Sequence, residues 1–157
     1  MTDLALPTRT GEAPATSQPA PGVTDPAVFV HRQLTQTAPV TMQAELFTRA
    51  SSLEGVEVAP SQISVPGARG FFLRPPARHG PAEAFMVGDE FAHLHPAEDG
   101  SLHLGLPADV HAAVLAHGWG EPHPLVGTPL LYGPRDPAEL EVVWQVFLCS
   151  YRFARGG

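Results

Sequence analysis

The chain has few of the features by which several protein classes are recognised. Its 157 residues include one cysteine, Cys149, so no disulfide can form within it, and we expect a reducing, cytoplasmic setting. No apolar run approaches the roughly 18 residues of a membrane span. The N-terminus lacks the basic and apolar regions of a secretory signal. We therefore expect a soluble protein without a membrane partner.

Basic residues are also scarce. Nine arginines, and no lysine, stand against 16 acidic residues, which gives a formal net charge of −7. Surfaces that bind nucleic acid need clustered positive charge, and these arginines form no cluster among aromatic side chains. Nucleic acid is therefore not an expected partner, and no segment of the sequence indicates an oligomeric state.

Composition divides the chain into two parts. Residues 1–24 hold four prolines among Thr, Ala, Ser and Gly, a composition typical of a disordered tail. Residues 25–157 are long enough for one domain with a buried core. A first helix is predicted from the Asp25-Pro26 cap to about Thr37, and a second from about Thr41 to a stop at Gly55.

The remainder combines short strand-like runs with two further helices. The strand-like runs cover residues 56–58, 63–65, 70–74, 84–87 and 129–132. Pro107 opens one predicted helix, and Asp136-Pro-Ala-Glu139 begins a longer one with an N-cap, a proline and an acid. Short connections between consecutive strands favour antiparallel pairing. We predict an α+β domain, with helices packed on one face of a mostly antiparallel sheet and a long C-terminal helix.

Residues 90–106 alternate in a way that separates two kinds of side chain. A strand points successive side chains to opposite faces, so leucines occupy one face. The other face carries Phe91, His93, His95 and His103. We expect the leucine face to meet the core and the histidine face to line a cleft or meet water.

A hairpin would bring these histidines together. The five-residue loop 96–100 between the two runs has turn chemistry. If it closes a hairpin, His103 pairs with His93 and Ser101 pairs with His95, with opposed Cβ atoms about 4.5–5.5 Å apart. Three imidazoles would then converge on one patch.

Three interpretations of this patch are open. His93, His95 and His103 could bind a metal, because neutral imidazole suits Zn, Fe, Ni or Cu and three ligands leave a position free for catalysis. They could instead form a metal-free cluster for acid–base chemistry, because imidazole titrates near neutral pH. They could also be structural, paired with Asp, Ser or backbone groups.

The second half of the chain resembles the fungal luciferase family. The shared pattern, strongest over residues 88–152, includes Glu90-Phe-Ala-His-Leu-His95, Leu102-His-Leu104, Gly118-Trp-Gly120, His123-Pro-Leu125 and Leu131-Tyr132. The resemblance implies an oxygenase that adds O2 to a hydroxylated α-pyrone, 3-hydroxyhispidin, after which the peroxide loses carbon dioxide. It also implies that no nucleotide or flavin is used, which favours the metal-free interpretation. The cofactor expectation is therefore none, or a single His-bound transition metal.

Carried over by position, the resemblance implies two sets of site residues. The catalytic candidates are His93, His95, His103 and His123. The substrate-binding candidates are Glu90, Asp99, Trp119, Tyr132 and Arg135. Plainer roles are open for three of these: Trp119 at the core edge, Tyr132 packed in a strand, and Arg135 paired with Glu139. The histidines outside the set, which are expected at the surface or at helix ends, are His31, His79, His111 and His117.

The function expected from these features is a luciferase-like oxygenase. It would add O2 to a hydroxylated pyrone or a similar planar small molecule, with histidines as acid–base groups or as holders of a metal. The alternative is a non-catalytic module of the same fold that binds a small molecule or a metal.

Overall fold

The computed structural model describes residues 4–157, in which pairs of consecutive strands are separated by helices. The α-helices are α1 (Val40–Ser51), α2 (Ala108–Ala116) and α3 (Pro137–Arg155), and the short 3-10 helices are η1 (Pro26–Val28) and η2 (Ala82–Ala84). The strands are β1 (Val56–Pro60), β2 (Arg69–Leu73), β3 (Glu90–Leu94), β4 (Leu102–Leu104), β5 (Gly120–Glu121) and β6 (Leu130–Leu131).

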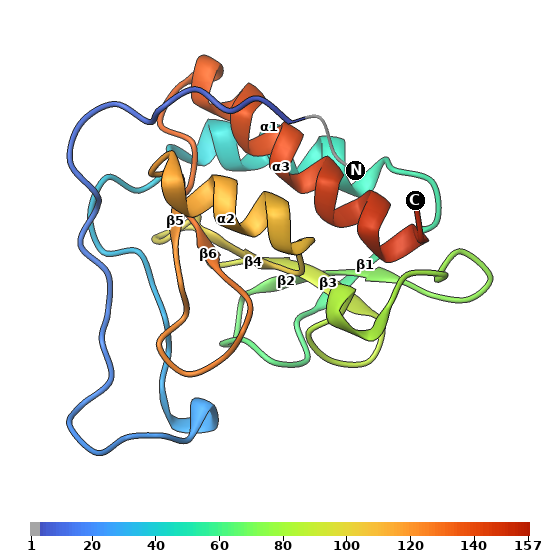
Figure 1. Ribbon diagram of the computed structural model, residues 1–157, viewed down its shortest axis with the longest axis horizontal. Coiled ribbons are helices and arrows are strands. Elements are labelled where there is room, and N and C mark those ends of the chain that lie inside the picture. Colours follow the sequence, from blue (N-terminus) through green and yellow to red (C-terminus); the bar gives the residue numbers. More distant parts are fainter. Residues whose placement is uncertain (1–3) are drawn as a thin grey trace.

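The strands form one antiparallel sheet in the order β1-β2-β3-β4-β6-β5. Helices α1, α2 and α3 lie together on one side of it, and loops lie on the other (Figure 1). The predicted α+β architecture, with its long C-terminal helix, is confirmed. Strand β5 was not predicted, because two residues are too short to show a periodic pattern.

The long helix α3 begins and ends where its sequence predicts. The Asp136 carboxylate accepts the backbone N–H of Glu139 at 2.8 Å, Pro137 opens the first turn, and Gly156 ends the helix with a φ of 87°. Only a residue without a Cβ adopts that left-handed conformation freely. On the buried side of α3, the Phe147 ring meets Phe71 edge-on at 5.2 Å between centroids.

The β3–β4 hairpin has the predicted register. His93 is opposite His103 and Leu94 is opposite Leu102, and the N–H of His95 donates to the carbonyl of Ser101 at 2.9 Å. The leucines face the helix side, where they are fully buried in the core.

A register shift between β2 and β3 changes the side to which Phe91 points. Phe71 pairs with Ala92 but Phe72 pairs with Glu90, so Phe91 is an extra residue, as in a β-bulge. Its ring packs 5.8 Å from that of Phe147, on the helix side. The prediction that Phe91 shares the histidine face is therefore wrong, because the bulge reverses the alternation. By the same shift, Glu90 comes to lie on the histidine side.

Three predicted elements do not form. The helix expected over residues 26–37 is limited to η1, and the runs 63–65 and 84–87 are not strands. Asp25 does cap η1 by accepting the N–H of Ala27 at 2.9 Å. Beyond it, the β-branched and aromatic run from Val28 to Val30 favours extended backbone over helix.

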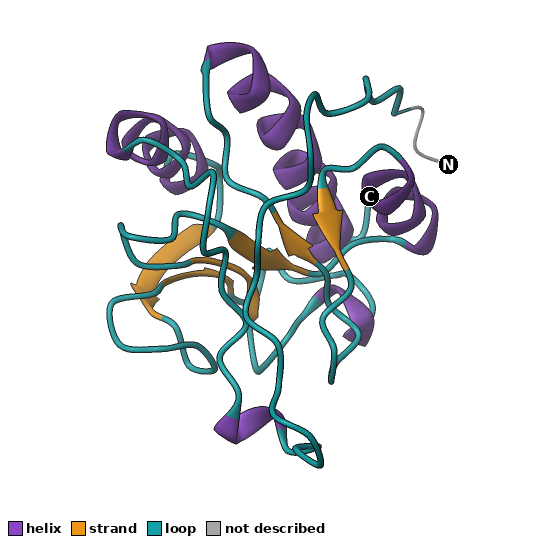
Figure 2. Cartoon of the chain, turned by 90° about the vertical axis from the view of Figure 1, so that its left-hand side faces the viewer, coloured by secondary structure: helices purple, strands orange, loops and turns teal. Residues whose placement is uncertain are grey.

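The N-terminal segment (residues 4–39) packs against the rest of the domain. In Figures 1 and 2 it passes along the helix layer, descends beside the sheet to η1, and returns to α1. Leu6 and Arg9 are buried, and the N–H of Arg9 donates to the carbonyl of His117 at 2.9 Å. The Gln33 side chain accepts the N–H of Gly133 at 3.0 Å. Residues 1–3 of the predicted tail lie outside the described residues.

In residues 4–157, no helix combines the length and the apolar character that crossing a bilayer requires.

Candidate functional site: a histidine-lined cavity

A cavity of about 570 Å³ opens on the side of the sheet away from the helices. Six histidines contribute to its lining, together with apolar residues from the N-terminal segment and three loops. The histidines are His31, His93, His95, His103, His111 and His123, and the apolar residues include Phe29, Val30, Ile63, Val65, Phe85, Met86 and Val126. A polar floor under apolar walls is the usual form of a small-molecule site.

His93 lies on β3 and is oriented by Glu90. Its Nδ1 is 2.9 Å from a carboxylate oxygen of Glu90. That carboxylate also accepts the Ser61 hydroxyl and the N–H of Gln62, both at 2.7 Å, and it is completely buried. Because the carboxylate can only accept, Nδ1 of His93 carries the proton and Nε2 keeps its lone pair.

His95 and His103 are oriented in the same sense. Nδ1 of His95 is 2.9 Å from the Ser101 hydroxyl and 3.1 Å from the Asp99 carboxylate. Ser101 donates its own hydroxyl proton to Asp99, so it accepts from His95. Nδ1 of His103 is 3.2 Å from the carbonyl of Pro129. Each ring therefore holds its proton on Nδ1 and has a free lone pair on Nε2.

In His123 the roles of the two ring nitrogens are exchanged. Its Nδ1 accepts the backbone N–H groups of Leu125 and Val126, at 3.0 and 3.2 Å. A ring nitrogen that accepts hydrogen bonds carries no proton, so the neutral ring of His123 is protonated on Nε2. His123 consequently offers the cavity an N–H donor.

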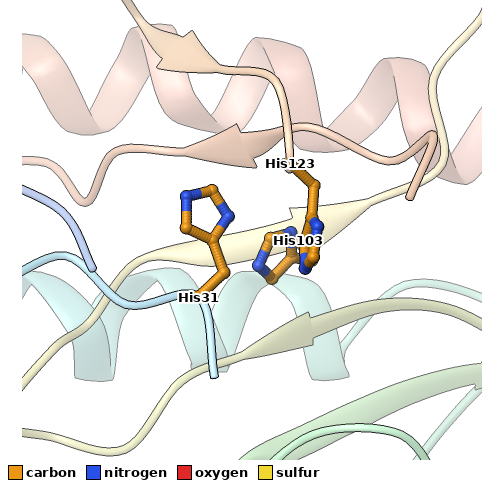
Figure 3. Close-up of side chains that lie close together, drawn as sticks. All are labelled: His31, His103 and His123. Carbon is orange, nitrogen blue, oxygen red and sulfur yellow. The ribbon is translucent and has the colours of Figure 1, made fainter. Parts of the chain in front are cut away.

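His31 is brought into this cluster by the N-terminal segment. Its ring centroid is 5.3 Å from that of His103 and 4.9 Å from that of His123. Nε2 of His31 is 3.0 Å from the Glu121 carboxylate, whereas its Nδ1 is buried and has no partner among the described residues. Figure 3 shows one ring nitrogen of His31 turned toward the other two histidines and the other turned away. The free atom is a lone-pair acceptor.

Four imidazoles of the cluster have pKa values below the ordinary value for histidine. Burial lowers the pKa of His93, although the Glu90 hydrogen bond works in the opposite direction. Burial and the neighbouring imidazoles lower the pKa of His103 well below its ordinary value. Burial, followed by the neighbouring His31, lowers the pKa of His123 to about 4, and burial also lowers that of His31. These four rings are uncharged at neutral pH.

The five predicted substrate-binding residues are held by protein partners, and none of them lines the cavity. Glu90 and Asp99 hold His93 and His95, as described above. Trp119 is buried and donates its Nε1–H to the carbonyl of Pro7 at 2.6 Å. Tyr132 donates its hydroxyl to Glu121 at 3.0 Å.

Arg135 joins helix α3 to the N-terminal segment. It forms an ion pair with Glu139 and donates to the Gln36 side chain at 2.9 Å and to the carbonyl of Thr10 at 2.8 Å. The plainer role expected for Arg135, a pairing with Glu139, is the one observed.

Three cavity-side residues escaped sequence reasoning: His31, His111 and Glu121. His31 was expected at the surface or a helix end, and it is instead 3% exposed. The alternation around Phe29-Val30-His31 is a strand-like signal, but the preceding helix cap at Asp25 obscured it. Glu121, which accepts from His31, Thr16 and Tyr132, lies on a two-residue strand without any pattern.

Comparison with known proteins finds similarity in the second half of the chain. Residues 88–150, which contain His93, His95, His103 and His123, match the model of the luciferase domain family. The resemblance seen in the sequence is confirmed over this segment. His31 lies outside it.

Individual relatives are fungal luciferases. Over 70 residues the chain is 39% identical to a luciferase of Armillaria ostoyae and 41% identical to one of Neonothopanus nambi, which covers 39% of this chain and 26% of each relative. The chain thus matches about a quarter of the length of these relatives. No solved structure matches the chain.

Proposed function

We propose that this protein is a luciferase-like oxygenase, which adds O2 to a hydroxylated pyrone or a similar planar small molecule. The observation that carries the proposal is the cavity floor. Neutral imidazoles, His123 from the segment similar to fungal luciferases and His31 from outside it, present a free lone pair and an N–H donor to one apolar-walled space. That combination can remove a proton from a substrate hydroxyl and stabilise the resulting oxyanion.

His31 is the proposed base. Its Nδ1 lone pair is the buried, unpartnered atom, and the Glu121 carboxylate accepts its other ring proton. A carboxylate in that position fixes the tautomer and stabilises the imidazolium that forms when the base takes a proton. In this proposal the side chains that cover the buried His31 Nδ1 move aside when substrate binds. The substrate hydroxyl proton then goes to His31 Nδ1, and Nε2–H of His123 donates to the oxyanion left behind.

The electron balance closes without an external reductant. The deprotonated pyrone is an enolate, and its electron pair forms the new carbon–oxygen bond to O2. The ring carbon is oxidised and O2 is reduced to the peroxide level. The apolar walls, which include Phe29 and Phe85, would hold a planar ring and keep water from the peroxide.

Oxygen uptake and photon counting with 3-hydroxyhispidin test the proposal. We expect substrate-dependent O2 consumption that falls about 10²–10⁴-fold in His31→Gln, the range for loss of a general base. His79→Gln, which changes an exposed histidine, is the matched control and should leave the rate unchanged. Binding of the pyrone without O2 consumption would instead favour the alternative, a non-catalytic binding module.

A further inference from the structure

The three imidazoles of the hairpin, His93, His95 and His103, share one hydrogen-bonding arrangement, which sets them apart from His31 and His123. Each has Nδ1 against an acceptor supplied by the protein: Glu90, the Ser101–Asp99 pair, or the Pro129 carbonyl. Histidines that bind metals characteristically donate their second ring N–H to a carboxylate or a carbonyl, which orients the ring and leaves the other nitrogen for the ion. Here all three rings meet that condition.

The three imidazole rings also converge. One nitrogen from each lies within 4.8 Å of those of the other two. His93 and His103 are directly paired on β3 and β4, and His95 follows β3 and is bonded through its N–H to Ser101. Metal–nitrogen distances are about 2.0–2.1 Å, so small side-chain rotations suffice to place the three nitrogens around one ion. The side chains are held on strands, which limits how far they can move apart.

Buried charge gives a second, independent reason. Glu90 and Asp99 are 0% and 2% exposed. Their charged contacts within residues 4–157 are to histidines, and no arginine is paired with either. Two fully buried carboxylates therefore lie beneath the floor with no arginine beside either of them. Uncompensated buried charge is costly, and a divalent cation on the other side of the imidazoles would offset it.

We infer that His93, His95 and His103 bind one divalent first-row transition metal ion. Neutral imidazole donors suit the ions from iron to zinc. Three protein ligands leave at least one coordination position open, and this position faces the cavity that His31 and His123 border. Glu90 and Asp99 act through the ligands, as positioning residues.

The neighbouring group His31, His103 and His123 does not form a second metal site. One ring nitrogen from each also lies within 4.8 Å of those of the other two, and Figure 3 shows the three rings close together. However, Nε2 of His123 carries a proton, because its Nδ1 accepts two backbone N–H groups. His103 has one free lone pair, which the first site uses. His31 alone remains, so we expect one ion per chain.

The inference concerns the same cavity as the proposed oxygenase, but it does not require the reaction, because binding is measured without substrate. Full-length protein is stripped with a chelator and titrated with Co²⁺, whose ligand-field bands in the visible region report coordination. We expect saturation at one equivalent. His93→Asn, His95→Asn and His103→Asn should each abolish saturable binding at micromolar Co²⁺, with far-UV circular dichroism showing that the fold is kept.

Two further pairs of variants make the test specific. Glu90→Gln and Asp99→Asn should weaken Co²⁺ binding about 10–100-fold, as for other residues that orient metal ligands. They also serve as the readout if a ligand variant does not fold. His31→Asn and His123→Asn are the matched controls, and they should retain one equivalent with affinity within a few-fold of the parent.

Absence of saturable Co²⁺ binding by the parent protein would overturn the inference. Loss of binding in His31→Asn with retention in His95→Asn would overturn it in favour of the neighbouring group, and two equivalents would overturn the expected single ion per chain. One equivalent of metal without O2 consumption would leave the metal site standing and defeat the proposed oxygenase. O2 consumption by stripped protein that does not bind Co²⁺ would support the proposed oxygenase and overturn the metal site.

Discussion

The two faces of one sheet show how the same strands serve opposite purposes. The helix-side face is an apolar core in which Phe71, Phe91 and Phe147 interlock among leucines of β3 and β4. The cavity-side face carries the histidines, and His31, His93, His95, His103 and His123 each have one ring nitrogen held by a protein partner. Because side chains alternate along a strand, β3 and β4 carry the apolar side chains on one face and the histidines on the other.

The difference between the faces lies in what each interaction specifies. Apolar packing on the helix side supplies most of the free energy of folding but is non-directional. Hydrogen bonds on the cavity side contribute less net stability, yet they determine which nitrogen of each imidazole is protonated. The bulge at Phe91 serves both faces at once, because it gives an aromatic ring to the core and a carboxylate, Glu90, to His93.

The largest stability effect is expected on the helix side. Phe147→Ala removes a fully buried ring from the centre of the aromatic cluster, and large-to-small changes of this kind cost about 3–5 kcal/mol of unfolding free energy. Urea denaturation measures it. Gln145→Ala, at an exposed position on the same helix, should change stability by no more than about 0.5 kcal/mol. Equal effects of the two variants would contradict the assignment of the core.

The next largest effect is expected from acidification, which should lower the free energy of unfolding through the histidines on the cavity side. His31, His93, His103 and His123 have pKa values lowered by burial, so between their ordinary value near 6.5 and about 4 for His123 the unfolded chain binds more protons. The free energy of unfolding therefore falls as pH drops from 6.5 toward 4, and it is flat with respect to these groups above 6.5.

Urea denaturation of chelator-treated protein between pH 7 and 5 tests this sign. That window avoids Asp99 and Glu139, whose pKa values lie below their ordinary acidic range and whose stabilisation is lost only at lower pH. The double variant His31→Gln/His123→Gln should show a shallower pH dependence, whereas His79→Gln should not. A stability that is constant from pH 7 to 5 would refute the buried neutral cluster.

An intermediate loss of stability is expected when Arg135, which joins helix α3 to the N-terminal segment, is replaced. Arg135→Ala removes the ion pair with the largely buried Glu139 and two hydrogen bonds to the N-terminal segment. Loss of hydrogen bonds to charged groups costs about 1.5–3 kcal/mol. We also expect faster proteolysis within residues 4–39. The exposed Arg32→Ala is the control, and similar proteolysis of both variants would show that Arg135 does not anchor the segment.

The smallest stability effects are expected from removing two helix caps, one on each side of the sheet. Asp136→Ala should cost about 1 kcal/mol, because Asp136 caps the long helix α3. Asp25 caps only the three-residue η1 near the cavity mouth, and Asp25→Ala should change stability by less than about 0.5 kcal/mol. Thermal or urea unfolding of both variants decides whether capping matters mainly where a long packed helix follows.

Strand pairing and the long helix could be predicted in large part from local patterns. Alternation and a turn-forming loop predicted the pairing of His93 with His103, and a cap, a proline and an apolar stripe predicted α3. The predicted helix after Asp25 fails because a correct cap was followed by residues that favour extended backbone. The side of Phe91 was wrong because one extra residue in a strand reverses every side chain before it.

The sequence by itself determined which residues could share a face, because strand and helix periodicities depend only on the spacing of residues that are near one another in the sequence. It also carried the resemblance over residues 88–150. Only the tertiary structure decided that His31 joins a cluster on strands more than 60 residues further along. It likewise decided which ring nitrogens remain free. Those outcomes depend on long-range contacts to Glu121, Pro129 and Glu90, and a local pattern contains no information about which distant acceptor a side chain will meet.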